Sequence, residues 1–272
     1  HEKYLGNTLA SIAFEKAGVV KPRGLVVTGE TKLESLAVIR KICQNQNANL
    51  IETEKDTETE TTIKEGLTTL TLKTPSAKYG PLVLSLRGRH QVDNAVVAVR
   101  LLESLSLPRT IHATAIETGL TKAQWPGRLE LLQTEGPRWV LLDAAHNLSA
   151  ADALGRYLTE TYPSGLPLIF SAMRDKNAAG IARRLENKVT RFICTSLAAP
   201  RAVPGPVLAE IVANSCPDTP REIADSPEAA LEAAWARGET ICAAGSTYLV
   251  GELMSLLEPT VTTVQTTSGL PR

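Results

Sequence analysis

The first half of the chain alternates between apolar runs and segments with apolar side chains at helical spacing. Residues 25–29 and 49–51 predict buried strands, and residues 33–43 between them predict an amphipathic helix. Residues 7–18 predict a short helix that ends at Ala17 and Gly18. The same reasoning gives two further strands and then two helices, over residues 67–73, 82–86, 93–105 and 112–123. Residues 52–65 lack apolar periodicity, so we expect an exposed loop there.

The second half has a steadier rhythm, which begins after the Trp-Pro-Gly break at residues 125–127. Pro and Gly oppose helix continuation, and we expect a domain boundary at this break. Strands are expected at residues 129–133, 139–143, 168–172, 192–196 and 240–244. The intervening segments have helical periodicity, and one of them starts with Ser226 as an N-cap followed by Pro227. This alternation predicts an α/β fold with a parallel sheet and helices on both faces.

The composition narrows the range of partners. The 272 residues contain 29 Lys and Arg against 29 Asp and Glu, so no overall positive field draws the chain to nucleic acid or to an anionic membrane. The four cysteines lie far apart without CxxC spacing, which disfavours a disulfide scaffold or a zinc ribbon. No long apolar run and no signal-peptide pattern are present. We therefore expect a reducing, cytoplasmic compartment, and any polyanionic ligand would have to bind at a local site.

The clearest candidate for a ligand site follows the apolar residues 140–142. Asp143, two alanines, His146 and Asn147 stand there at a predicted strand-to-helix turn. Ligands of doubly wound sheets gather at the carboxyl ends of strands, where Asp143 can accept hydrogen bonds from ribose hydroxyls and His146 can donate to a phosphate or a carboxylate. The alternative is that Asp143 or Asn147 only caps the next helix.

Two other segments have the composition of anion sites. Residues 87–94 bring two arginines and His90 to a predicted turn before a helix, although Asp93 or Asn94 could simply cap that helix. Arg128 follows the Pro-Gly break, where either a ligand or an interdomain salt bridge would suit a guanidinium.

Three further groups of polar residues could belong to a functional site or have only a structural role. Lys16, next to Glu15, could form an ordinary ion pair at a helix end. Residues 175–177 (Asp-Lys-Asn) follow a strand and either serve catalysis or cap a helix. Ser246 lies in a Gly-Ser-Thr segment that could hold a carboxylate or only start the helix over residues 248–257.

Two nucleotide-binding motifs are absent from these 272 residues. No GxGxxG follows a strand, so a nicotinamide or flavin enzyme has little support. No GxxxxGK[ST] is present either, so the sequence contains no self-contained phosphate-binding loop.

Taken together and in order, several segments resemble the folylpolyglutamate synthase and dihydrofolate synthase family, the folate branch of the Mur ligase superfamily. The resemblance starts at His1 and continues through short matches at residues 4–8, 12–13, 15–22, 88–95, 125–130, 142–147, 173–176 and 245–252. The pieces Lys-Ala-Gly-Val-Val-Lys-Pro and Trp-Pro-Gly-Arg-Leu-Glu are folate-type rather than cell-wall-type. The matches span nearly the whole chain.

This resemblance implies an ATP-dependent amide ligase. A substrate carboxylate takes a phosphoryl group from ATP, and the amine of L-glutamate then attacks the acyl phosphate to give amide, ADP and phosphate. Mg²⁺ would neutralise the polyphosphate. The implied substrates are dihydropteroate or folate, L-glutamate and ATP, with no nucleic acid or membrane partner, and we expect a monomer.

The resemblance also implies roles for metal, catalytic and amino-acid-binding residues. His1 matches a magnesium ligand, and Lys16 matches a lysine that becomes carbamylated, which would make it an oxygen donor. His146 matches a residue near the terminal phosphate and the incoming amino acid. Ser246 is similar to a position that holds the amino-acid substrate.

Three residues match nucleotide contacts of the family. Asn94 corresponds to an adenine contact, Arg128 to a phosphate contact and Asp143 to a ribose contact. Two departures accompany these matches: Ala144 stands where the family has Gly, and Arg23 replaces the Gly expected after Pro22.

The expected architecture has three parts. Residues 1–124 are the C-terminal portion of a Mur-ligase-type central ATPase domain, residues 125–258 are a Rossmann-like ligase domain, and residues 259–272 are a disordered tail. The family's glycine-rich ATP loop lies upstream of the His motif, so we expect the isolated chain to be inactive. The alternatives are a non-catalytic module derived from a ligase and a cell-wall amino-acid ligase.

Overall fold

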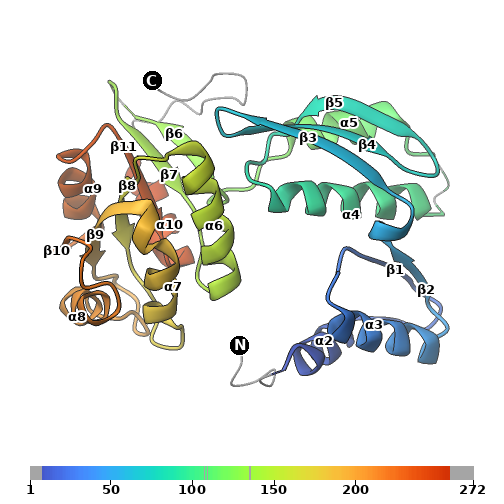
Figure 1. Ribbon diagram of the computed structural model, residues 1–272, viewed down its shortest axis with the longest axis horizontal. Coiled ribbons are helices and arrows are strands. Elements are labelled where there is room, and N and C mark those ends of the chain that lie inside the picture. Colours follow the sequence, from blue (N-terminus) through green and yellow to red (C-terminus); the bar gives the residue numbers. More distant parts are fainter. Residues whose placement is uncertain (1–7, 107, 109, 135, 258–272) are drawn as a thin grey trace. The chain divides into compact units, whose positions relative to one another are not determined.

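The computed structural model describes residues 8–106, 108, 110–134 and 136–257. The chain divides into two compact units (Figure 1). Unit 1 consists of His1–Thr62, Thr69–Leu84 and His90–Lys122, and unit 2 consists of Ile63–Thr68, Ser85–Arg89 and Ala123–Arg272.

The start of unit 1 is a pair of helices next to a pair of parallel strands. Helix α2 (Leu9–Ala17) packs on α3 (Leu33–Asn45), and β1 (Leu25–Thr28) pairs with β2 (Asn49–Glu52). These elements confirm the predicted helices and strands. Gly18 is the C-cap of α2 with a φ of −58°, so the helix ends there without the left-handed conformation that a glycine allows.

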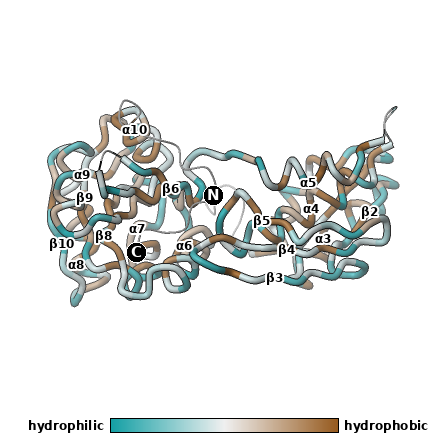
Figure 2. The backbone as a smooth tube through the Cα atoms, turned by 90° about the horizontal axis from the view of Figure 1, so that it is seen from above, coloured by the Kyte–Doolittle hydropathy of each residue, from teal (hydrophilic) through white to brown (hydrophobic). Residues whose placement is uncertain are grey.

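A strand replaces the loop that was expected over residues 52–65. After a short 3₁₀ turn at Thr53–Lys55, β3 (Glu58–Lys64) joins β4 (Leu67–Lys73) and β5 (Lys78–Val83) in a three-stranded sheet of order β3-β4-β5. The expectation was wrong because β3 is an edge strand whose side chains are almost all exposed. It therefore carries Glu, Thr and Lys instead of an apolar alternation (Figure 2). Strand β5 also starts earlier than the predicted residues 82–86.

The core of unit 1 lies between this sheet and two helices, α4 (His90–Ser104) and α5 (Ala113–Lys122). Leu70 and Leu72 of β4 are fully buried against Val99 of α4. Helix α4 starts three residues earlier than predicted, so the polar residues 90–94 lie in its first turns instead of in a loop.

Unit 2 is built on a six-stranded sheet of order β10-β9-β8-β11-β7-β6. Its strands are β6 (Glu130–Gln133), β7 (Trp139–Leu142), β8 (Leu166–Phe170), β9 (Val189–Thr195), β10 (Arg221–Ala224) and β11 (Thr240–Ala244). All neighbours are parallel except β6, which pairs antiparallel with β7. The predicted parallel sheet is thus confirmed apart from this edge strand. Strand β10, the opposite edge, was not predicted because it is short and mostly exposed.

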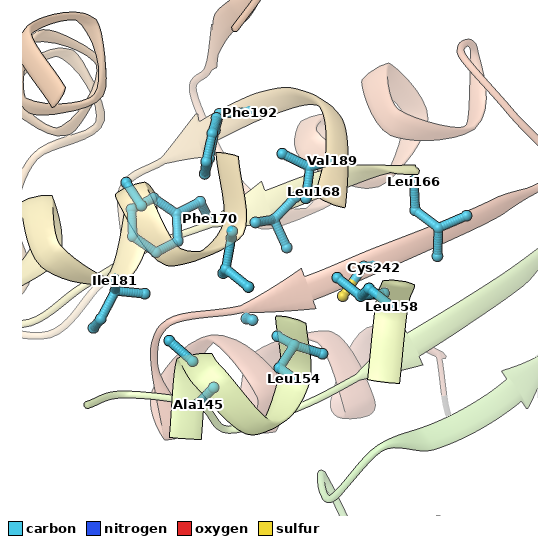
Figure 3. Close-up of a cluster of buried hydrophobic side chains, with 14 of the residues drawn as sticks. Ala145, Leu154, Leu158, Leu166, Leu168, Phe170, Ile181, Val189, Phe192 and Cys242 are labelled. Carbon is cyan, nitrogen blue, oxygen red and sulfur yellow. The ribbon is translucent and has the colours of Figure 1, made fainter. Parts of the chain in front are cut away.

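Helices cover both faces of this sheet, as the sequence predicted. Helices α6 (Leu148–Thr161), α7 (Ala178–Leu185) and α8 (Gly205–Ser215) bury one cluster of side chains, and α9 (Pro227–Trp235) and α10 (Thr247–Leu257) bury the other. Figure 3 shows the first cluster, in which Leu154 and Leu158 of α6 lie over the sheet near Cys242. A fully buried Leu contributes about 1.5–3 kcal/mol, so such clusters hold the three layers together. Ser226 caps α9 by accepting the Ala229 N–H, as predicted.

The order of the strands places three strand ends side by side. From β7 the chain passes through α6 to β8 and continues outward to β9 and β10, and β11 then returns to fill the place between β8 and β7. The carboxyl ends of β7, β11 and β8 therefore meet at one edge of the sheet, near the point where the strand order reverses.

The four cysteines are unpaired and buried. Burial raises the pKa of the Cys194 thiol to about 12, so this side chain stays uncharged in the core. No helix within the described residues is long and apolar enough to cross a membrane.

Candidate functional site

Polar side chains follow each of the three central strands of unit 2. Asp143 and His146 follow β7, Asp175 and Lys176 follow β8, and Ser246 follows β11. The register aligns the strand ends, because Ala243 pairs with Leu142 on one side and Ala244 pairs with Phe170 on the other. The segments singled out from the sequence after these strands thus lie at the same edge of the sheet.

A cavity of about 180 Å³ lies at this edge. Its lining residues are His146, Met173, Asp175, Lys176, Arg201, Ser246, Thr247 and Tyr248. Pockets that enclose drug-sized ligands measure about 300–1,000 Å³, so this cavity suits a smaller molecule. All of its lining residues belong to unit 2.

The charges in the cavity wall are unevenly matched. Lys176 Nζ lies 3.0 Å from the Asp175 carboxylate, and Arg201 Nη1 lies 3.8 Å from the same group. The hydrogen bond from Lys176 is the main cause that lowers the pKa of Asp175, which therefore stays ionised. Two cations share one carboxylate, and the remaining positive charge favours an anionic ligand.

The imidazole of His146 is held in one tautomer. Its Nδ1 lies 2.8 Å from the carbonyl oxygen of Ala144, which can only accept, so Nδ1–H is the donor. In the neutral ring, Nε2 is then left as a hydrogen-bond and proton acceptor. His146 also lines the cavity, so this acceptor belongs to a side chain of the site.

The helix cap after β7 is Asn147 and not Asp143. The Asn147 side chain accepts the Ala150 N–H at 2.9 Å and starts α6. The sequence left both residues open as caps, and the structure assigns the capping role to Asn147. Asp143 is thereby free for another role.

Asp143 is a buried carboxylate that holds a neighbouring turn. It is 6% exposed and accepts the backbone N–H of Leu129 at 3.0 Å. Burial raises the pKa of Asp143 to about 6, although the Leu129 N–H and the charge of Arg128 act in the opposite direction. The same carboxylate that sequence analysis proposed as a ligand contact therefore also anchors the chain.

The turn that carries Arg128 is fixed at both ends. Gly127 donates its N–H to Glu130 Oε2 at 2.7 Å and accepts the Ala144 N–H at 2.8 Å. Gly127 has a φ of +67° and Leu129 a φ of +47°, so two residues of the turn adopt left-handed conformations. These bonds connect Arg128 to the loop after β7 and place it beside Asp143.

Ser246 has a structural role as well as a place in the cavity wall. Its hydroxyl oxygen accepts the Tyr248 N–H at 3.1 Å at the start of α10, and the residue is 1% exposed. The preceding Gly245 has a φ of +107°, and a Cβ there would collide with the carbonyl oxygen of Ser171. This glycine lets the ends of β8 and β11 approach closely enough to form the site.

The remaining predicted site residues are not part of unit 2 as the structure describes it. Lys16 is exposed in the last turn of α2, and Asn94 is exposed on α4, where its Nδ2 donates to Gln91 Oε1 at 3.0 Å. Both belong to unit 1, and Asn94 is not a helix cap because α4 already begins at His90. His1 lies outside the described residues, and within them no group of three or more His, Cys, Asp or Glu side chains is placed to hold a metal ion.

Sequence reasoning passed over Arg201. It follows β9, the fourth strand of the sheet, in a segment of small residues without a recognisable motif. The rule that ligands bind at strand ends could have singled out this loop, but it gives no reason to prefer residue 201 within it.

Residues 127–247 match the family described as Mur ligase, glutamate ligase domain. Over 266 residues the chain is 30% identical to a dihydrofolate synthase/folylpolyglutamate synthase of Bacillus subtilis (strain 168), with 95% of this chain and 60% of that protein covered.

Two crystal structures of folylpolyglutamate synthases are similar to this chain. The enzyme of Thermotoga maritima is 30% identical with a TM-score of 0.77, covering 92% of this chain and 58% of its own. The Mycobacterium tuberculosis enzyme, complexed with ADP and AMPPCP, is 26% identical with a TM-score of 0.85, covering 94% and 61%. This chain thus spans about 60% of the length of these three proteins.

Proposed function

Because the chain belongs to the folylpolyglutamate synthase/dihydrofolate synthase family of the Mur ligase superfamily, we propose that the protein carrying it is an ATP-dependent ligase. It attaches L-glutamate to dihydropteroate, to a reduced folate or to both, and acts in the cytoplasm. The observation that carries this proposal is the small, positively charged cavity at the ends of β7, β8 and β11, which suits a free amino acid.

The reaction has two steps. A carboxylate oxygen of the pteroate or folate attacks the γ-phosphorus of ATP, and ADP leaves. The amine nitrogen of glutamate then attacks the acyl carbon to form a tetrahedral intermediate. This intermediate collapses to the amide and releases phosphate, which retains the oxygen that bridged carbon and phosphorus. The incoming ammonium group must lose protons for the attack.

His146 is the group we assign to that proton transfer. Its Nδ1–H donates to the carbonyl oxygen of Ala144 at 2.8 Å, so the neutral ring presents Nε2 as a proton acceptor. Ser246, in the same cavity wall, is suited to bind a carboxylate of the amino acid.

Arg128 and Asp143 are assigned to the nucleotide. Arg128 supplies a cation for a phosphate group, and its turn is held by the bond from Leu129 to Asp143. A carboxylate has about four acceptor positions, so Asp143 can serve this bond and a ribose hydroxyl together. The family resemblance supplies two further assignments. Asn94 is proposed as an adenine contact, and Lys16 is proposed as a carbamylated lysine.

Magnesium fits this set of residues only together with the nucleotide. Mg²⁺ is usually bound by one or two protein ligands and by substrate phosphates, so it does not require three protein ligands at one place. When bound, the ion neutralises charge on the phosphates. The described residues supply the cation at Arg128 and the proton acceptor at His146.

A coupled assay of ADP release tests the proposal. The protein is expressed with all of its natural sequence and given ATP, Mg²⁺, L-glutamate and either dihydropteroate or tetrahydrofolate. ADP release should require both the pteridine substrate and glutamate. No release with either substrate would support a non-catalytic module, and release with muropeptide precursors alone would support a cell-wall ligase.

A further inference from the structure

The loop that carries Arg201 is hydrogen-bonded to the segment that follows β8. The backbone N–H of Arg174 donates to the carbonyl oxygen of Arg201 at 2.8 Å, and Arg174 Nε donates to that of Ala202 at 3.2 Å. Met173 and Ala202 form an antiparallel bridge, and Val203 donates to Ala172 at 2.9 Å. The backbone of Arg201 is therefore fixed although the residue lies in a loop.

The guanidinium of Arg201 is available to a ligand. Its side chain is 65% exposed, and the Asp175 carboxylate at 3.8 Å is beyond hydrogen-bond distance. Asp175 is also engaged by Lys176 at 3.0 Å. Among the described residues, none accepts a hydrogen bond from this guanidinium. Arg201 thus brings a positive charge with free donors to the wall of the cavity.

We propose that Arg201 is a specificity-determining residue that binds a carboxylate of the incoming amino acid and selects a dicarboxylic amino acid over an uncharged one. This inference rests on the proposed function. The cavity of about 180 Å³ has the volume of about six water molecules, which suits an amino acid better than a whole nucleotide. Ser246 and Arg201 both line it, so the two carboxylates of glutamate have two separate partners. A guanidinium matches a carboxylate with two parallel hydrogen bonds.

Arg201 would discriminate glutamate from glutamine because glutamine leaves the charge of the guanidinium without a partner. Glutamine has the length of glutamate but carries an amide where glutamate has its second carboxylate. Its amide oxygen can accept a hydrogen bond from Arg201 but supplies no opposite charge, and its amide nitrogen is a donor that would face a second donor of the guanidinium. The enzyme should therefore prefer glutamate through the Michaelis constant for the amino acid.

The test compares Arg201→Ala, Arg201→Gln and Arg201→Lys with wild type in the ligase assay. Loss of a charge-assisted bond should raise the KM for glutamate about 10- to 100-fold, with kcat at saturating glutamate and KM for ATP unchanged. Arg201→Lys should recover part of the affinity, and the preference for glutamate over glutamine should fall in the Ala and Gln variants. Arg237→Ala is the matched control, because Arg237 is 49% exposed and lies 3.4 Å from Glu222 outside the cavity.

The outcomes separate this inference from the proposed function. An unchanged KM for glutamate in an active Arg201→Ala enzyme overturns the assignment of Arg201 and leaves the ligase function intact. A raised KM for ATP with an unchanged KM for glutamate overturns it in favour of a phosphate contact. A wild-type protein that joins no amino acid to a pteridine substrate overturns both.

Discussion

The buried carboxylate of Asp143 accepts the backbone N–H of Leu129 at 3.0 Å, and this bond ties the Arg128 turn to the end of β7. Leu129 has a φ of +47°, a conformation that costs a non-glycine residue about 1–2 kcal/mol. The turn keeps this conformation because Leu129 is 1% exposed and its N–H has a buried acceptor. Arg128 is therefore positioned by a residue that the sequence presents only as a ligand contact or a cap.

Replacing Asp143 with Asn should change how stability depends on pH. Burial raises the pKa of Asp143 from 3.8 to about 6, so between about pH 4 and 6 the folded protein binds a proton that the unfolded chain has lost. The stability from this group is complete below about pH 4 and is lost as the pH rises through about 6. The Asp143→Asn variant lacks this loss, so its free energy of unfolding should rise relative to wild type by about 3 kcal/mol over that range.

Urea unfolding of both chains at several pH values measures this difference. Asn retains a side-chain oxygen for the Leu129 N–H, so the comparison isolates the charge. Parallel stability curves for the two chains from pH 4 to 7 would show that the carboxyl group titrates normally.

Replacing Gly127 with Ala should destabilise unit 2 by more than backbone strain alone. A Cβ at Gly127 would lie 2.6 Å from Val250 Cγ1, so overpacking adds about 1–3 kcal/mol to the left-handed strain. Gly136→Ala is the matched control, because Gly136 has a φ of +74° but no atom within 4 Å of its added Cβ. Denaturant unfolding should show a clearly larger loss for Gly127→Ala, and equal losses would contradict the packing described for this turn.

Replacing His146 with Ala should lower kcat without unfolding the protein. A positioned general base contributes about 10²- to 10⁴-fold to a rate, and His146 is the proton acceptor assigned in the cavity. His112, which is exposed in unit 1, provides the control substitution to Ala. If kcat falls equally in both variants, or stays at the wild-type value in His146→Ala, the assignment of the proton acceptor is wrong.

The elements that sequence predicted well are those whose signals are local. Strand β7 follows from its run of apolar residues, and the start of α9 follows from the Ser226 cap and the following proline. Strand β3 escaped prediction because an exposed edge strand needs no apolar face. The antiparallel direction of β6 depends on the neighbour it pairs with, and the sequence carries no signal for that choice.

Several residues of the site could be predicted from the sequence, but the contacts between them could not. Residues directly after apolar strands, such as Asp143, His146 and Ser246, follow from the rule for strand ends. The anchoring role of Asp143 depends on a turn 14 residues earlier in the chain. The position of Arg201 depends on the hydrogen bonds that Arg174 donates to the loop. Contacts between loops that are distant in sequence are set by tertiary packing, so local patterns do not show them.

The fate of the substrate carboxylate oxygen tests the central claim most directly. The full natural protein is given ATP, Mg²⁺, L-glutamate and a pteroate or folate whose reacting carboxylate carries the heavy isotope of oxygen, and the released phosphate is examined by mass spectrometry. An acyl-phosphate ligase should form the glutamate amide and transfer one labelled oxygen to each phosphate. Phosphate without label, or ADP release without amide, would contradict the account.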